Sequence, residues 1–137
     1  MKRTVIGLAA VIGMTGAAFA QTDVTPSVSA ADQDVSNGIV SADTVNASEN
    51  GWLVIHRTDA EMAPGPVVGY APIRAGSTSD VAAILQEDIA SGDMLMLMVH
   101  SEAGGTETGV FEYTLGATED GPIRINGDLV MTTITAQ

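Results

Sequence analysis

Two histidines and a row of methionines are the residues of this chain best suited to chemistry. His56 and His100 are the only histidines in the sequence, and each lies at the end of an apolar run that predicts a β-strand. Met94, Met96 and Met98 alternate along the second of these runs. Side chains two residues apart point to the same face of a strand, so the methionine row continues into His100. Imidazole and thioether ligands together suit copper, and one hypothesis is a periplasmic copper-binding protein that uses these five residues.

A structural interpretation explains the same residues without a metal, and we favour it. Each imidazole would cap the end of its strand by hydrogen bonding a backbone carbonyl, and the methionines would fill an apolar core. The sequence contains no Cys, so a blue-copper centre, which needs a thiolate, is excluded. No cofactor is therefore expected.

Other arrangements that support catalysis or metal binding are not found in the sequence. The closest acidic groupings are Asp32 with Asp34, Glu87 with Asp88, and Glu119 with Asp120. None of them has the spacing of an EF-hand, and we interpret them as a solvated acidic surface. Ser101 follows His100 without the G-x-S-x-G context of a hydrolase nucleophile, and no phosphate-binding glycine loop is present. Catalysis is therefore not expected.

Composition excludes nucleic acid as a partner. The chain has 137 residues, with 17 acidic and five basic side chains and a formal net charge of −12. Such a surface repels nucleic acid and anionic lipid. Two Phe, two Tyr and one Trp are also too few to form a platform for stacking bases. The length corresponds to one small domain.

The first 20 residues have the three parts of a secretory signal peptide. Lys2 and Arg3 form the positive start, residues 5–16 are apolar, and residues 18–20 read Ala-Phe-Ala, a typical cleavage site. Cleavage would leave Gln21 as the first residue of an exported protein, periplasmic or extracellular. No later stretch is apolar enough to span a bilayer, so no membrane span is expected after cleavage. The predicted divisions are a signal peptide (1–20), a linker or weak first strand (21–31) and one β-domain (32–137).

Turn signals recur along this domain at intervals typical of an all-β fold. Three Asn-Gly pairs, at 37–38, 50–51 and 126–127, favour tight hairpin turns. Residues 79–91 show a helical spacing of apolar side chains, but a strand at 77–85 agrees better with the neighbouring strands. The other strands are expected at 39–45, 52–57, 67–71, 94–99, 109–115, 123–125 and 129–134.

The pattern of these strands predicts how they pack. Residues 52–55 and 94–99 are apolar throughout instead of alternating with polar residues. This indicates central strands that are covered on both faces. About seven strands in roughly 100 residues predict an antiparallel two-sheet sandwich of immunoglobulin-like type.

Several motifs, taken in order, resemble an uncharacterised domain family of exported proteins. They are GWLVIH at 51–56, APGPVVG at 63–69, AG at 75–76, LMLMVH at 95–100 and GPIRING at 121–127. The family occurs in secreted bacterial proteins and in acidic archaeal cell-surface proteins. The resemblance implies a β-sandwich and no established activity.

The sequence therefore predicts an exported, non-catalytic β-sandwich module with a structural or binding role and an unidentified partner. The first alternative is the periplasmic copper protein that uses His56, His100 and the methionine row. The second alternative is a small sandwich enzyme.

Overall fold

The computed structural model describes residues 23–137, and this part of the chain is built from β-strands and loops. The predicted signal peptide, residues 1–20, lies outside the described residues. No helix within residues 23–137 is long and apolar enough to cross a membrane. The strands are β1 (Ser27–Ser29), β2 (Ile39–Ala47), β3 (Gly51–Thr58), β4 (Val67–Ile73), β5 (Gly76–Leu85), β6 (Met94–Ser101), β7 (Arg124–Ile125), β8 (Asp128–Leu129) and β9 (Met131–Thr135).

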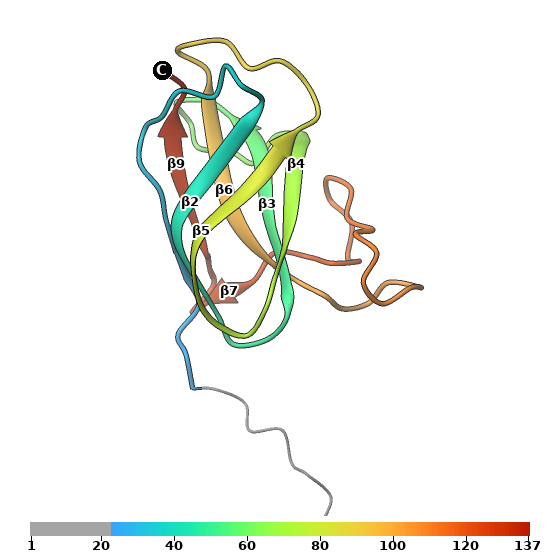
Figure 1. Ribbon diagram of the computed structural model, residues 1–137. Coiled ribbons are helices and arrows are strands. Elements are labelled where there is room, and N and C mark those ends of the chain that lie inside the picture. The colour runs from blue at the N-terminus through green and yellow to red at the C-terminus, as the bar shows by residue number, and fades with distance from the viewer. Residues whose placement is uncertain (1–22) are drawn as a thin grey trace, which may run out of the picture.

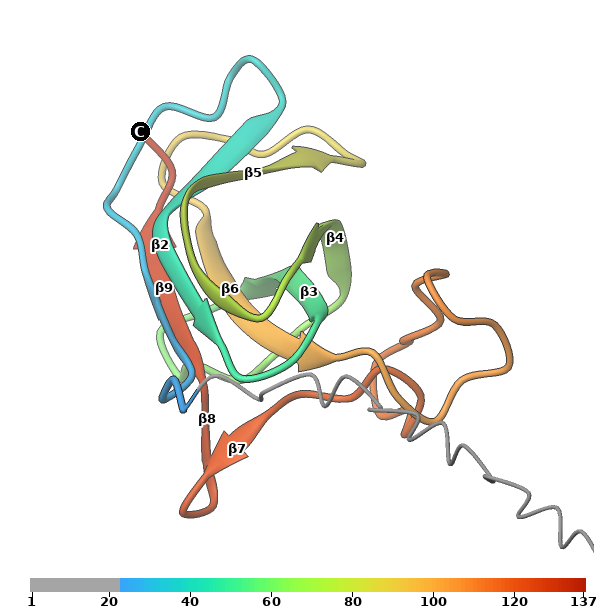
Figure 2. The ribbon, with the colours of Figure 1, turned by 60° about the horizontal axis from the view of Figure 1, so that its bottom comes forward.

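Seven of these strands form one antiparallel sheet in the order β1-β2-β5-β4-β3-β6-β9 (Figure 1). The sheet curls until its two edges approach each other, as the view in Figure 2 shows. Beyond the edge strands, Gln33 forms a parallel bridge with Ala136, and the amide of Gln137 donates to the carbonyl of Gln33 at 2.9 Å. The result is nearly a barrel.

The predicted all-β class is confirmed, but the two-sheet sandwich is not clearly formed. A sandwich requires the hydrogen-bonded ladder to break between two sheets, whereas here the ladder continues from edge to edge. Its narrowest point is the junction of β4 and β5, where only Gly69 and Tyr70 pair with Leu85 and Ile84. A Cβ atom on Gly69 would lie 2.8 Å from the carbonyl oxygen of Ile84, so glycine permits the close approach that keeps the sheet continuous.

The main core fills the inside of the curl. In the central strands it takes the odd-numbered side chains, which include Leu53 and Ile55 of β3 and Leu95 and Leu97 of β6. The even-numbered side chains of β3 and β6 point to the outer face of the sheet and are nevertheless buried, except Met94 and Thr58 at the ends of the strands. The prediction of central strands covered on both faces is therefore confirmed. The cover on the outer face is a loop segment, residues 102–123, instead of a second sheet.

Local expectations were met at some turns and strands and not at others. Residues 79–91 begin in β5, so the preferred strand is confirmed over the helix. The closing hairpin is also confirmed, with Asn126 and Gly127 at φ of 52° and 91° in the turn between β7 and β8. The strand predicted at 109–115 is wrong, because this stretch lies in the loop segment and has no neighbouring strand with which to pair.

Candidate functional site

The candidate site lies on the outer face of β3 and β6. Antiparallel pairing sets three side chains of β3 opposite three of β6: Trp52 with His100, Val54 with Met98, and His56 with Met96. The two histidines therefore occupy diagonal corners of this six-residue patch, with Val54 and Met98 between them. All six side chains are buried, and both histidines are 0% exposed.

The two imidazoles meet across the patch. Their Nε2 atoms are 3.3 Å apart, and the rings are stacked with centroids 5.4 Å apart. On the far side of each ring, Nδ1 lies against a backbone carbonyl, 2.8 Å from Gly65 for His56 and 2.6 Å from Asp120 for His100. The histidine pair is thus a chain of three close contacts that begins and ends on carbonyl oxygens.

This chain of contacts lacks one hydrogen. A hydrogen is needed to bridge each of the two carbonyl contacts and the contact between the Nε2 atoms, whereas two neutral imidazoles together carry only two N–H groups. A carbonyl oxygen can only accept, and the two contacts to carbonyls are the shorter ones. Both hydrogens therefore lie on Nδ1. The two Nε2 atoms then face each other with their lone pairs and no hydrogen between them.

Burial disfavours the additional proton that would bridge the two Nε2 atoms. Loss of hydration lowers the pKa of His56, and the carbonyl of Gly65 offsets this only in part. The same loss of hydration lowers the pKa of His100 to about 4, with the carbonyl of Asp120 opposing the change and positive charge on His56 adding to it. Near pH 7 the pair is therefore neutral.

The aromatic rings of residues 23–137 gather around the histidine pair. These rings are Trp52, Tyr70, Phe111 and Tyr113. Tyr113 packs edge-on against His100 with centroids 4.5 Å apart, and its ring centroid is 5.9 Å from that of His56. Phe111 contacts Tyr70 at 4.2 Å and Trp52 at 5.4 Å. Phe111 and Tyr113 come from the loop segment, so this segment shields the pair from water with its two largest apolar side chains.

Three carboxylates hold the loop segment in place. Asp120 is 1% exposed, and its Oδ1 and Oδ2 accept from the amides of Ala103 at 3.1 Å and Glu112 at 2.8 Å. Glu102 accepts the indole N–H of Trp52 at 2.7 Å and the amide of Gly109 at 2.9 Å. Glu112 in turn accepts from the amide of Thr106 at 2.7 Å. In Figure 2 the segment forms an excursion that leaves β6 and returns to β7.

Two glycines set the backbone around the histidines. The amide of Gly65 donates to the carbonyl of Arg57 at 2.8 Å, which lays the Pro64–Pro66 turn against β3 and directs its own carbonyl to His56. A Cβ atom on Gly65 would lie 2.6 Å from the Arg57 carbonyl oxygen. A Cβ atom on Gly51 would lie 2.2 Å from the carbonyl oxygen of His100. Gly51 is thus needed for the close approach of β3 to β6. The Asn-Gly motif at 50–51 predicted a hairpin turn with positive φ, but Gly51 does not adopt a positive φ.

The structure brings together most of the residues that the sequence singled out. His56, His100, Met96 and Met98 share the patch, and Met94 continues the same row at the half-exposed start of β6, opposite Thr58. Both imidazoles also bond a backbone carbonyl, as the structural interpretation required. Within residues 23–137, no group of three or more His, Cys, Asp or Glu side chains is placed to hold a metal ion. Metal binding by His56, His100, Met94, Met96 and Met98 stays the alternative hypothesis.

Sequence reasoning missed the covering residues of this site. Asp120 was assigned to the solvated acidic surface, but it is buried and accepts two backbone hydrogen bonds. Its φ of 45° also departs from the usual range for a residue other than glycine. Phe111 and Tyr113 could have been suspected, because two of the few aromatic residues fall in a stretch rich in glycine and threonine.

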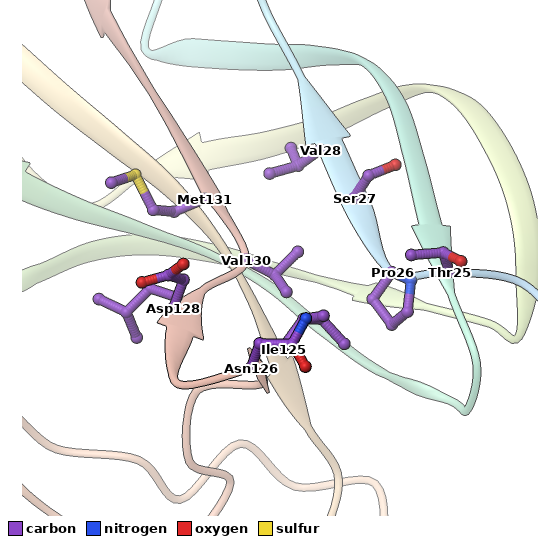
Figure 3. Close-up of a pocket in the computed structure, with 10 residues that line it drawn as sticks. Thr25, Pro26, Ser27, Val28, Ile125, Asn126, Asp128, Val130 and Met131 are labelled. Atoms are coloured by element: carbon purple, nitrogen blue, oxygen red, sulfur yellow. The ribbon is translucent and has the colours of Figure 1, made fainter.

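One surface pocket lies away from the histidine pair, and another borders the patch at Trp52. A pocket of about 370 Å³ lies between the segment around β1 and the β7–β8 hairpin, and Figure 3 shows its lining. Asp128 is its one titratable residue. A second pocket, of about 280 Å³, lies beside Trp52 and Glu102 at the edge of the loop segment. Neither pocket is lined by a histidine.

Comparison with known proteins identifies the family. Residues 26–137 match the family model described as a domain of unknown function (DUF7282). The chain is also 32% identical over 107 residues to cell surface glycoprotein 2 of Haloarcula hispanica, a match that covers 77% of this chain and 11% of that protein. The chain thus spans about a tenth of its curated relative, and no solved structure matches it. With a family model that covers its whole β-domain, the chain belongs to the DUF7282 family of domains of unknown function.

Proposed function

We propose that this protein is an exported, non-catalytic module that acts structurally or by binding a partner at the cell surface or in the periplasm. The distant similarity to a cell-surface glycoprotein supports export. So does the signal-peptide pattern of residues 1–20. The acidic composition, with a formal net charge of −12, suits an exposed and well-hydrated surface.

The observation that carries the non-catalytic proposal is the enclosure of the histidine pair. A general acid or base must come within hydrogen-bonding distance of its substrate, directly or through one water molecule. His56 and His100 are both 0% exposed, and each has its Nδ1 engaged by a carbonyl. Tyr113 and the loop segment that carries it lie between the pair and solvent. The arrangement is suited to stability or to holding something small, and not to turnover of an external substrate.

Two measurements test this proposal. Cells that produce the full-length chain are fractionated, and intact cells are treated with protease; the protein should be found outside the cytoplasm, and recovery in the cytoplasm would overturn export. Purified protein is then assayed on panels of ester, glycoside and peptide substrates, with His100→Asn as the matched control. Turnover by the wild type that is lost in a folded His100→Asn variant would overturn the non-catalytic role.

A further inference from the structure

The two Nε2 lone pairs face each other without a hydrogen between them, and a metal ion could accept both lone pairs. We propose that His56 and His100 bind one Cu(I) ion through their Nε2 atoms, and that a thioether from Met96 or Met98 completes the site. This inference goes beyond the proposed module function and does not depend on it.

The spacing of the two nitrogens fits a shared metal ion. Metal–nitrogen distances of about 2.0–2.1 Å place two ligand nitrogens about 3.3–3.6 Å apart, for N–metal–N angles from tetrahedral to trigonal. The Nε2 atoms of His56 and His100 are 3.3 Å apart. The carbonyls of Gly65 and Asp120 hold each ring by its Nδ1–H, so the tautomer that leaves Nε2 free for a metal is already fixed.

The other donors on this face are sulfur atoms. Met96 lies opposite His56 across the β3–β6 ladder, and Met98 lies between the two histidines on the same face. Both methionines are buried, at 0% and 1% exposure. Thioether ligands favour Cu(I), whereas Zn(II) takes its ligands from Cys, His, Asp and Glu. Within the described chain those side chains do not form a group of three that could hold a metal.

The charge of the site also favours a monovalent ion. The nearest buried carboxylate, Asp120, accepts hydrogen bonds from the amides of Ala103 and Glu112, and its backbone carbonyl is what faces His100. An ion at the pair would therefore be buried against imidazole, thioether and aromatic groups without a facing anion. Burying an uncompensated charge is costly, and the cost rises steeply with the charge of the ion. Cu(I) meets this condition better than a divalent metal.

The loop segment supplies a route for entry. The last residues of the segment pair with β6, through the bridge of Pro122 with His100 and the hydrogen bond from the amide of Ser101 to the carbonyl of Gly121. Residues 103–119 form no strand, and the side chains of Glu102, Glu112 and Asp120 supply much of their anchoring. Such a segment can open locally without disrupting the β3–β6 ladder, which continues through eight consecutive residue pairs. The aromatic cover would then close over a bound ion and keep water and oxygen from it.

The test is an anaerobic titration of the purified protein with Cu(I) in competition with a chromophoric Cu(I) chelator of known affinity. The expected result is one ion per chain, with nitrogen and sulfur scatterers in the copper X-ray absorption spectrum. Asn is the informative replacement for each histidine, because its amide N–H can replace Nδ1–H while Nε2 is lost. His56→Asn and His100→Asn should each weaken Cu(I) binding by more than about 100-fold. The double variant Met96→Leu/Met98→Leu should weaken it by about 10-fold or more, and Met94→Leu, the matched control, should leave it unchanged.

Several results would overturn the inference. These are no tight Cu(I) binding by the wild type, full binding by both Asn variants or by the double Leu variant, and tighter binding of Zn(II) than of Cu(I). If an Asn variant fails to fold, titration of ¹⁵N-labelled wild type with Ag(I), a redox-inert substitute for Cu(I), decides the question. Both Nε2 resonances should then shift while both Nδ1–H groups persist; Nε2 resonances that do not move would refute the site.

Discussion

Acid should destabilise this protein through its buried histidine pair. The pKa of His100 is about 4 in the folded protein, against an ordinary value of 6.5. Between these values the unfolded chain binds more protons than the folded one, so stability falls as the pH falls. With about 1.4 kcal/mol for each unit of pKa difference, His100 alone removes about 2 kcal/mol between pH 7.5 and pH 5. His56, whose pKa is also lowered by burial, changes stability in the same direction.

Urea unfolding at fixed ionic strength measures this loss. For a domain of this size, a loss of about 2 kcal/mol lowers the urea midpoint by about 1 M between pH 7.5 and pH 5. Asp93 and Glu112 should add little to this change, because hydrogen bonds from Arg57 and Thr106 lower the pKa of their carboxylates still further from this range. The control is His100→Asn, which removes the titrating group while an amide N–H can replace the bond to the carbonyl of Asp120. Its midpoint should change less over the same range.

A flat midpoint in the wild type between pH 7.5 and pH 5 would refute this reasoning. It would mean that the folded protein takes up a proton as readily as the unfolded chain. The third hydrogen would then bridge His56 Nε2 and His100 Nε2, and the N–H···N bond would outweigh the cost of burying the charge.

Four further outcomes follow from the fold and the sequence. Met96→Ala should lower the free energy of unfolding by about 2–5 kcal/mol, because it leaves a cavity in the buried patch. Met94→Ala, at the half-exposed start of β6, should lower it far less, and equal losses in urea unfolding would contradict the burial of the patch. Gly51→Ala should lower the free energy of unfolding by at least about 1–3 kcal/mol, because its Cβ would lie 2.2 Å from the His100 carbonyl oxygen. An unchanged urea midpoint would show that β3 and β6 have room for this atom between them. The melting temperature should rise from low to moderate NaCl, since salt screens the repulsion of a chain with net charge −12; a flat or falling midpoint would show that its carboxylates do not repel strongly. Mass spectrometry of exported protein should find Gln21 at the N-terminus, and an intact signal segment would contradict cleavage.

Strands could be predicted from the sequence because their signals are local. Alternation of apolar residues, continuous apolar runs and turn residues depend on neighbours along the chain, and they located β2 to β6 and the Asn126–Gly127 turn. Whether the strands form one sheet or two depends on the short pairing of two consecutive strands, β4 with β5, at Gly69 and Tyr70. No periodicity reports whether a ladder continues or breaks at such a point, so one curled sheet could not be told from a sandwich.

The candidate site was accessible to sequence reasoning only in part. Alternation along β6 placed Met96, Met98 and His100 on one face. The contact between the rings of His56 and His100 depends on the pairing of β3 with β6, which no local pattern specifies. The position of the loop segment over the histidines could not be predicted. It depends on side-chain contacts such as those of Asp120, and no sequence pattern indicates these contacts. Within this segment the sequence predicted a strand at 109–115, because the apolar run there includes Phe111 and Tyr113.

The most direct test of this account is the position of the hydrogens on the two imidazoles. Long-range ¹H–¹⁵N spectra of the metal-free protein at pH 7 report which nitrogen of each ring is protonated. The account predicts Nδ1–H on both His56 and His100, with both Nε2 atoms bare and 3.3 Å apart. A hydrogen on Nε2 of either ring would contradict it, because the contact between the rings would then be an ordinary hydrogen bond with no need of a further ligand.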